Sequence, residues 1–417
     1  MNLRRALIII VVTMIVMHVI MMFGDKMSGK RNKCVIGGNV KDETKSSWTI
    51  YIIKAPEYGD NQLPTSFETY FKQNHIQYSN VYTINTNFLF CRNHVLTNSS
   101  FKKVTPYTKL IYGLVSSNNI ACKRAIAEAL SGTEYIPKTI VLSSDEESRK
   151  IQLGEIDTNR KYIFKQNIQQ QMGITLAKTP EEVTKNILNV KNVVLQEVLT
   201  NPLLVNNRKV NMRIYVLVVF NPHKQFLEKN TFVSSLIGSL KGGVSPTQYE
   251  DSNTTKTFSV HMYSNGFMYY TKQFFETKGD DMYTMDNLIT TGYIDRQVYK
   301  ENPLTLYDLL DHLGEIKFNA IFTNITKGIN AIFTSVKFKG IHEFESKAQN
   351  KTRRFSIFGC DIAPDEDFNV KIMEINKGPD LSGKDERDIK LKTHMVETFM
   401  NYILDGRTCK ELIPIIQ

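Results

Sequence analysis

The residues best suited to chemistry in this 417-residue chain lie close together near its C-terminal end. In the segment 355–381 (FSIFGCDIAPDEDFNVKIMEINKGPDL), two strand-like runs flank the polar turn PDEDFN. Side chains alternate along a strand, so Glu374 and Asn376 project on one side while Ile375 packs on the other. Asp361, on the first run, can face the same pocket. This hard oxygen set suits Mg²⁺ holding nucleotide phosphates, although on spacing alone solvated hairpin charges explain it as well.

A second segment, 193–220 (VVLQEVLTNPLLVNNRKVNMRIYVLVVF), resembles the hinge and strand of the tubulin–tyrosine ligase-like family, in which a PLL hinge leads to an Arg-Lys strand with a later arginine. With this stretch in view, residues 355–381 resemble the family's G-x-D…E-(I/V)-N-x-x-P element. Weaker matches upstream are NIACKRAIAEAL (119–130), YIPKTIVL (135–142) and YIFK (162–165). The resemblance runs in order from about 119 to 404, and leaves the first quarter and 221–257 unmatched.

The resemblance implies an α/β (α+β) fold of the ATP-grasp type, in which two β-rich subdomains sandwich ATP. Alternating strand and helix patterns before residue 142, among them a helix over 118–130, predict a small leading domain with a parallel sheet. Ser264-Asn265 predicts a hairpin turn, and apolar residues at helical spacing over 396–404 predict a closing amphipathic helix. The expected domains are a membrane anchor (1–23), a linker (24–47), an N-terminal α/β domain (48–142), a central ATP-grasp subdomain (143–208) and a C-terminal ATP-grasp subdomain with the metal-binding hairpin (209–417).

The resemblance also assigns site residues by position. The cofactor-binding residues would be Lys123, Lys165, Gln196, Glu197, Val198, Leu199, Lys209, Asn211 and Arg213; the metal ligands would be Asp361, Glu374 and Asn376; and the catalytic residues would be Arg213 and Glu374. Lys165 and Lys123 would bring ammonium charges to the triphosphate oxygens, and Lys209 would serve the nucleotide as well. Arg213 would face the phosphates or an acidic substrate with its planar donor fork. The backbone of 196–199 would line the adenine edge, and two Mg²⁺ ions would bridge the β- and γ-phosphates.

The reaction implied is ATP-dependent amide synthesis on a protein carboxylate, through an acyl phosphate that the amine of a free amino acid attacks. Tubulin or another acidic, glutamate-rich protein tail would be the acceptor, and the net charge of +10 suits such a partner. No basic stripe with interleaved aromatics points to nucleic acid. Neither a G-x-x-x-x-G-K-[ST] loop nor an H-R-D with D-F-G is present, which argues against P-loop and protein kinase chemistry. We expect a monomer.

The chain departs from the family pattern at four places. The phosphate-covering loop QNIQQQMGITL has only Gly173, Asn211 stands where an aspartate is usual, LITTGY (288–293) replaces the H-L-T-N element, and Tyr269 stands where an arginine is expected. The metal set is kept while acceptor-recognition positions differ, which favours an active ligase with a changed substrate. The alternative is a catalytically impaired pseudoenzyme, a membrane-tethered module that binds an acidic partner without turnover.

The N-terminus predicts a retained single-pass membrane anchor. Ala6–Phe23 is an apolar run of 18 residues, which as a helix reaches ~27 Å, close to the ~30 Å of a hydrocarbon core. A cleaved signal peptide is the alternative, but no small-x-small site follows the run. Basic residues flank both ends, with a slight excess after it that favours a cytoplasmic catalytic domain. Five cysteines without a CxxC pair fit reduced thiols in the same compartment.

Overall fold

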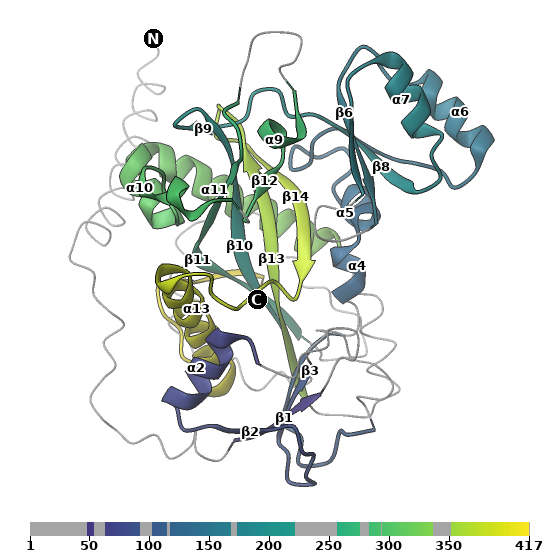
Figure 1. Cartoon of the computed structure of the whole chain (residues 1–417). Coiled ribbons are helices and arrows are strands. Elements are labelled where there is room, and N and C mark those ends of the chain that lie inside the picture. Colours follow the sequence, from purple (N-terminus) through teal and green to yellow (C-terminus); the bar gives the residue numbers. More distant parts are fainter. Residues whose placement is uncertain are drawn as a thin grey trace, which may run out of the picture. The chain divides into compact units, whose positions relative to one another are not determined.

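A computed structural model describes residues 48–53, 63–91, 102–114, 117–167, 173–221, 257–275, 283–292, 294–336 and 352–416 of the chain (Figure 1). All of them belong to one compact unit, Thr44–Gln417. The anchor and linker predicted at 1–47, and residues 222–256 of the unmatched insertion, lie outside the described residues. None of the helices in the described part is long and apolar enough to cross a bilayer.

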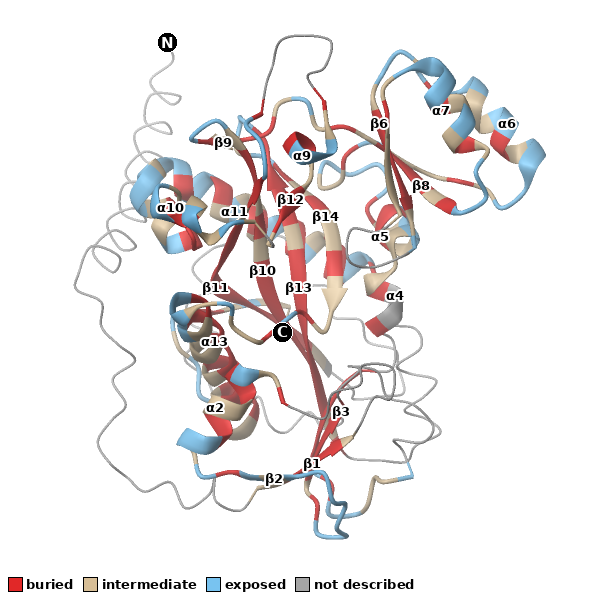
Figure 2. Cartoon of the chain, viewed as in Figure 1, coloured by how far each residue is buried: buried red, intermediate tan, exposed pale blue. Residues whose placement is uncertain are grey.

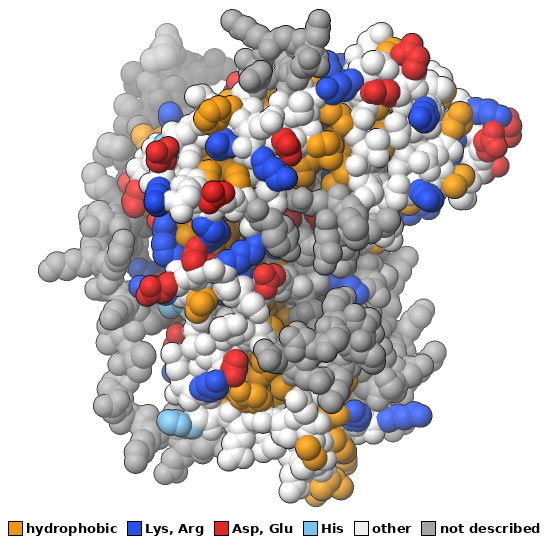
Figure 3. Space-filling model, in the orientation of Figure 1, with side chains coloured by type: hydrophobic (Ala, Val, Ile, Leu, Met, Phe, Trp, Pro, Cys, Tyr) orange, Lys and Arg blue, Asp and Glu red, His pale blue; other side chains and the backbone are white. Residues whose placement is uncertain are grey.

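The leading domain is the parallel sheet that the sequence predicts. Its strands, in the order β2-β1-β3-β4, are β1 (Thr49–Ile53), β2 (Gln77–Ser79), β3 (Phe88–Cys91) and β4 (Leu110–Tyr112), and every neighbouring pair is parallel. Helix α2 (Thr65–Gln73) covers one face, where Phe67 packs edge-on against Phe90 at 4.9 Å between ring centroids. Hydrophobic side chains nevertheless remain on the outside at the end of the molecule that these strands occupy, at the bottom of Figure 3.

This small sheet continues into a much larger one. Strand β4 pairs in parallel with β13 (Arg353–Pro364), which extends the order to β12-β11-β10-β13-β4-β3-β1-β2. The other strands are β9 (Leu204–Val205), β10 (Arg208–Asn221), β11 (Thr257–Thr271), β12 (Thr290–Thr291), β14 (Val370–Lys377) and β15 (Leu412–Ile416). β14 pairs with β13, β15 with β11 and β9 with β10. Figure 2 shows that β10, β11 and β13 are buried along most of their length, as their near-continuous apolar runs require.

Helices cover the large sheet. They are α9 (Met285–Leu288), the 3₁₀ turn η4 (Arg296–Lys300), α10 (Leu306–Leu313), α11 (Glu315–Ser335) and α13 (Glu386–Asp405). Phe333 of α11 packs edge-on against Phe358 of β13, and Phe399 of α13 packs against Tyr263 of β11. The closing amphipathic helix expected around residues 396–404 is confirmed, since it buries Val396, Phe399, Met400 and Ile403.

A second, antiparallel sheet has the order β5-β8-β6-β7, from β5 (Thr139–Val141), β6 (Tyr162–Gln166), β7 (Ile174–Ala177) and β8 (Asn192–Glu197). Helices α6 (Glu146–Gly154) and α7 (Pro180–Ile187) accompany it, each N-capped by a side chain, Asp145 and Thr179. β5, which the predicted boundary at 142 places in the N-terminal domain, pairs with β8 of this sheet. The mixed α/β architecture with two β-rich parts is therefore confirmed.

Two local predictions were wrong. The hairpin expected at Ser264-Asn265 is instead a bulge inside the continuous strand β11, because the register with β10 jumps from Ile214↔Gly266 to Val216↔Met262. The helix expected over 118–130 divides into α4 (Ser117–Ala121) and α5 (Lys123–Ala129), because Cys122 adopts extended backbone angles (φ −82°, ψ 127°). The break makes Lys123 the first residue of α5.

Candidate active site

Three charged side chains form a row across the middle of the large sheet. The register pairs Arg213 of β10 with Asp361 of β13, and Asp361 with Glu374 of β14. Directly paired residues of antiparallel strands lie on the same face, so all three project together. Cys360 and Ile375, which alternate with them, are buried on the opposite face. The facing predicted for Asp361 and Glu374 is confirmed.

Asp361 is held by two partners. The Arg213 guanidinium donates to both carboxylate oxygens, from Nε to Oδ1 and from Nη2 to Oδ2 at 2.8 Å. Asn376 Nδ2 lies 3.4 Å from Oδ2. Burial acts to raise the pKa of Asp361, and the adjacent Arg213 charge acts against that rise. Gly359 makes room for the arginine, because a Cβ there would lie 2.9 Å from Arg213 Cδ and 3.0 Å from Pro379. A metal ion at Asp361 would therefore have to share it with Arg213.

Lysines from two other elements, α5 and β6, approach this row. Lys123 Nζ lies 3.4 Å from Glu374 Oε1. Lys165 of β6 is buried, donates to Gln196 Oε1 at 2.7 Å, and experiences the charges of Glu374, Lys123 and Asp361. Lys123, Lys165 and Gln196 line one small pocket together with Thr139 and Met373. The structure thus brings these sequence-predicted residues together.

A third lysine, Lys209 of β10, has fewer polar contacts than Lys123 or Lys165. It is only 3% exposed, and within the described residues its ammonium has no hydrogen-bond or ion-pair partner. Burial lowers its pKa to about 8, and the charge of Lys165 adds to that shift. Burial likewise lowers the pKa of Lys165 to about 8. A buried cation without a counter-ion is costly, so Lys209, with the charge of Lys165 near it, fits an anionic ligand such as a phosphate chain.

Two backbone amides of residues 196–199, the segment expected to line the adenine edge, are already hydrogen-bonded within the protein. The amides of Glu197 and Val198 already donate to the carbonyls of Lys138 and Lys161. The Glu197 side chain binds Arg160, and Gln196 binds Lys165. Contacts of this segment with a base are therefore left to its other polar groups and to the half-buried Leu199.

Two of the places where the chain departs from the family pattern, Asn211 and Tyr269, lie on strands beside this row. Tyr269 pairs with Asn211, and its ring lies 5.1 Å from the Arg213 guanidinium, a cation–π contact in place of a second positive charge. Within the part of the chain that the structure describes, the buried Oδ1 of Asn211 has no hydrogen-bond partner. Thr290 and Thr291 form β12, paired with β11. In the phosphate loop, residues 168–172 lie outside the described residues.

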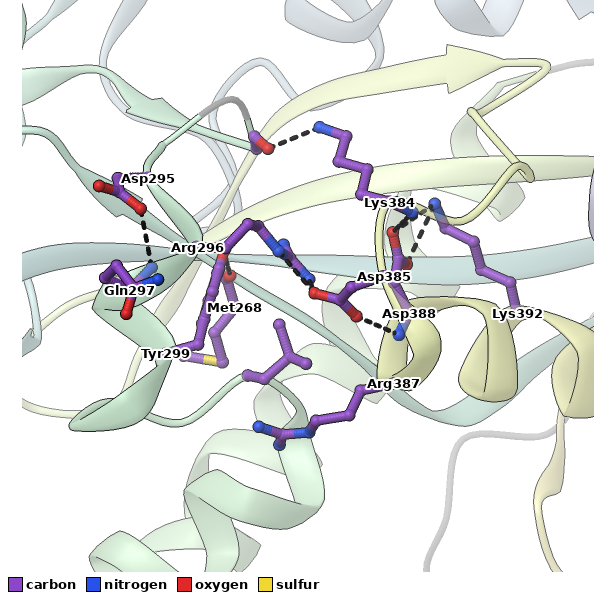
Figure 4. A network of polar contacts seen from close by, with 12 residues as sticks. Met268, Asp295, Arg296, Gln297, Tyr299, Lys384, Asp385, Arg387, Asp388 and Lys392 are labelled. Carbon is purple, nitrogen blue, oxygen red and sulfur yellow. Dashed lines mark hydrogen bonds and ion pairs between the residues drawn. The ribbon is translucent and has the colours of Figure 1, made fainter.

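Sequence reasoning missed a polar network that fixes the loop after Asn376 (Figure 4). Lys392 and Asp388, both of α13, form a buried ion pair at 3.2 Å. Lys392 Nζ also donates to the carbonyl of Ser382 at 2.7 Å, and Asp388 accepts from the amide of Lys384 at 2.8 Å. The only signal in the sequence is an i, i+4 Asp/Lys pair, which on most helices is exposed. The network holds the loop that connects the Asn376 strand to α13.

We predict that Lys392→Met lowers the free energy of unfolding by about 3 kcal/mol, because it leaves a buried Asp388 carboxylate without its cation. Methionine retains most of the buried apolar stem, so packing alone should change little. Urea denaturation of the two proteins measures the difference. Lys390→Met is the matched control, because Lys390 is exposed on the same helix. Equal losses in both variants would show that the ion pair contributes nothing particular.

The residues present fit a magnesium-nucleotide site. Asp361, Glu374 and Asn376 provide oxygen donors from adjacent strands, and Lys165 and Lys209 provide cations for phosphates. Among the described residues there is no group of three or more His, Cys, Asp and Glu side chains that could enclose a metal. Two carboxylates and an amide suit Mg²⁺, which keeps water and substrate phosphates among its ligands.

The comparisons with known proteins identify the family of the chain. The Tubulin-tyrosine ligase family matches residues 61–232 and 252–410, so the chain belongs to that family. It is 25% identical over 272 residues to tubulin polyglutamylase ttll-4 of Caenorhabditis briggsae, a match that covers 64% of this chain and 40% of that protein. It is 23% identical over 222 residues to the probable tubulin polyglutamylase TTLL9 of Rattus norvegicus, covering 52% of this chain. In both cases the match spans 40% of the relative's length.

Proposed function

We propose that the chain is an ATP- and Mg²⁺-dependent ligase that joins the amine of a free amino acid to a protein carboxylate. The acceptor carboxylate would attack the γ-phosphorus of ATP, releasing ADP and forming an acyl phosphate. The amine would then displace inorganic phosphate from the acyl carbon and lose a proton to form the amide. Catalysis of this kind depends on alignment and on neutralising charge, without a covalent enzyme intermediate. The observation that carries the proposal is the row of Arg213, Asp361 and Glu374 beside the buried Lys165 and Lys209.

Each residue would have a defined task. Asp361, Glu374 and Asn376 would hold Mg²⁺, which withdraws charge from phosphoryl oxygens. Lys165 and Lys209 would bind phosphate oxygens in a site from which water is largely excluded, where a charge contact is strong. Arg213 already satisfies Asp361, and its remaining donor capacity would orient either the γ-phosphate or the acceptor carboxylate.

For the acceptor, we propose an acidic protein tail. The relatives are named as tubulin polyglutamylases, and a glutamate-rich tail of tubulin or of a similar protein suits the net charge of +10. Residues 6–23 would tether the enzyme to a membrane with its catalytic domain on the cytoplasmic side. Incubation with ATP, Mg²⁺, mixed labelled amino acids and a pool of acidic proteins, followed by mass spectrometry, identifies both substrates. Failure to bind nucleotide at any Mg²⁺ concentration would remove the ligase proposal.

Binding of ATP should take up protons near pH 8. Lys165 and Lys209, whose pKa values lie at about 8, are each about half protonated at that pH. Triphosphate oxygens favour the charged ammonium and raise both pKa values, so the complex should gain up to about one proton in total. Uptake should fade below pH 6.5, where both amines are already charged. Titration calorimetry in buffers of different ionisation enthalpy measures the number of protons directly.

Lys209→Met is the informative variant for this measurement, since it should remove about half of the uptake and weaken ATP binding. Lys178→Met is the control, because Lys178 lies outside the row, on the segment between β7 and α7. Uptake that is unchanged in Lys209→Met would contradict the placement of the phosphates at this lysine.

A further inference from the structure

The leading domain exposes a cluster of apolar side chains away from the candidate active site. Val81, Ile84 and Tyr107 are 71%, 66% and 57% exposed. The first two lie in the loop between β2 and β3, and the third lies just before β4. Single exposed apolar residues are ordinary, but a group of them on neighbouring loops is a mark of an interaction surface. We call Val81, Ile84 and Tyr107 the apolar tip.

The two loops of the apolar tip are tied to each other. Tyr82 donates from its hydroxyl to the carbonyl of Lys103 at 3.1 Å, and packs edge-on against Tyr51 of β1 at 5.3 Å. Lys103 in turn donates to the Tyr51 hydroxyl at 2.6 Å. Within the first loop, the amide of Val81 donates to Ser79 Oγ. The apolar side chains are therefore presented on an ordered support that rests on the sheet.

The surroundings of the apolar tip are basic. From the residue after Glu68 to the residue before Glu128 the chain contains no aspartate or glutamate. Lys102 and Lys109, which flank the second loop, are both exposed. In Figure 3 hydrophobic side chains gather at the lower end of the molecule, with basic ones near them. Aliphatic side chains, tyrosines and lysines match the composition that proteins use at the surface of an anionic bilayer.

The chain upstream explains why a bilayer would be within reach. The apolar segment Ala6–Phe23 precedes residues 24–47, which extend at most about 80 Å and end directly before β1. β1 is also the strand to which the first loop is joined, because the amide of Thr49 donates to Asn87 Oδ1 at 2.9 Å. An anchored chain would therefore keep the leading domain within about 80 Å of the membrane surface.

We propose that the apolar tip and its lysines dock onto an anionic lipid surface, and so fix the orientation of the domain relative to the membrane. Val81, Ile84 and Tyr107 enter the interfacial region, while Lys102 and Lys109 contact lipid headgroups. The proposal does not depend on the ligase activity, because the surface shares no residue with the candidate active site.

Hydrogen exchange of the full chain in nanodiscs tests the proposal. On phosphatidylcholine–phosphatidylserine nanodiscs, amides of residues 80–87 and 105–109 should exchange at least about fivefold more slowly than on phosphatidylcholine alone. Salt near 0.5 M should remove the difference, since it shortens the Debye length to a few ångström. The double variant Val81→Asp, Ile84→Asp should lose the protection.

The matched control is Ile151→Asp with Val190→Asp, two positions that are similarly exposed, at 66% and 74%, near the second sheet. Protection should persist in this control, and thermal unfolding should be unchanged in both double variants, because every substituted side chain is exposed. Equal exchange on the two lipid surfaces would overturn the proposal. A soluble polyglutamate peptide that protects the same amides in the absence of lipid would overturn it too, in favour of an acidic peptide as the occupant.

Discussion

Replacing Glu374 by glutamine should reduce amino-acid transfer by about a hundredfold to a thousandfold, the scale seen when one charge-stabilising group of a preorganised site is removed. The substitution keeps the size and hydrogen-bonding capacity of the side chain and removes only its negative charge. That charge lies opposite Asp361 and 3.4 Å from Lys123 Nζ. Without it the metal would lose one of its two carboxylates, and Lys123 would lose its ion-pair partner.

Folding should survive this change, since the Glu374 side chain is 31% exposed and glutamine retains its shape. Circular dichroism and thermal unfolding check this point. Glu366→Gln is the control, because Glu366 is an exposed carboxylate on the turn of the same hairpin. Transfer should be normal in the control. Comparable activity in Glu374→Gln and in the unaltered protein would exclude Glu374 as a metal ligand.

Replacing Arg213 by methionine should destabilise the protein by about 3–5 kcal/mol in the absence of metal, as well as abolish transfer. Arg213 and Asp361 have side chains that are 13% and 15% exposed, so the variant would leave an uncompensated carboxylate in a poorly hydrated position. Added Mg²⁺ should restore a large part of the lost stability, because a cation at Asp361 would replace the missing guanidinium.

Urea denaturation with and without millimolar Mg²⁺ measures this effect. Mg²⁺ should stabilise Arg213→Met more than the unaltered protein, in which arginine and metal share the carboxylate. Arg208→Met serves for comparison, because Arg208 lies on the same strand and donates to backbone carbonyls, among them that of Thr271 at 2.9 Å. A Mg²⁺ response of the same size in all three proteins would mean that the metal binds elsewhere.

The sequence was a good guide wherever a property depends on neighbouring residues. Strand alternation predicted that Glu374 and Asn376 share a face and that Ile375 packs on the other, because the side-chain period of a strand is two in any sheet. The hairpin of β13 and β14 is equally local, since its strands are joined by the short turn PDEDFN. The order of motifs from about 119 to 404 was enough to indicate the family, which the match over 61–232 and 252–410 confirms.

Predictions from the local sequence pattern were wrong at two places where the backbone conformation differs from local propensity. Ser264-Asn265 has turn-forming residues, but β11 continues through them because it is paired with β10 on one side and β15 on the other. Cys122 interrupts what reads as one helix. Both are cases in which tertiary context overrides local propensity.

The chemistry of the site itself was decided by the tertiary structure. Arg213 and Asp361 are 148 residues apart in the chain, and only the register between β10 and β13 places one opposite the other. Lys165 and Lys209 are ordinary lysines in the sequence, and their pKa values of about 8 arise from burial. The sequence by itself determines residue types and local periodicity. Long-range strand register and the exclusion of water exist only in the folded chain. These two features of the fold bring separate charged residues together into a site.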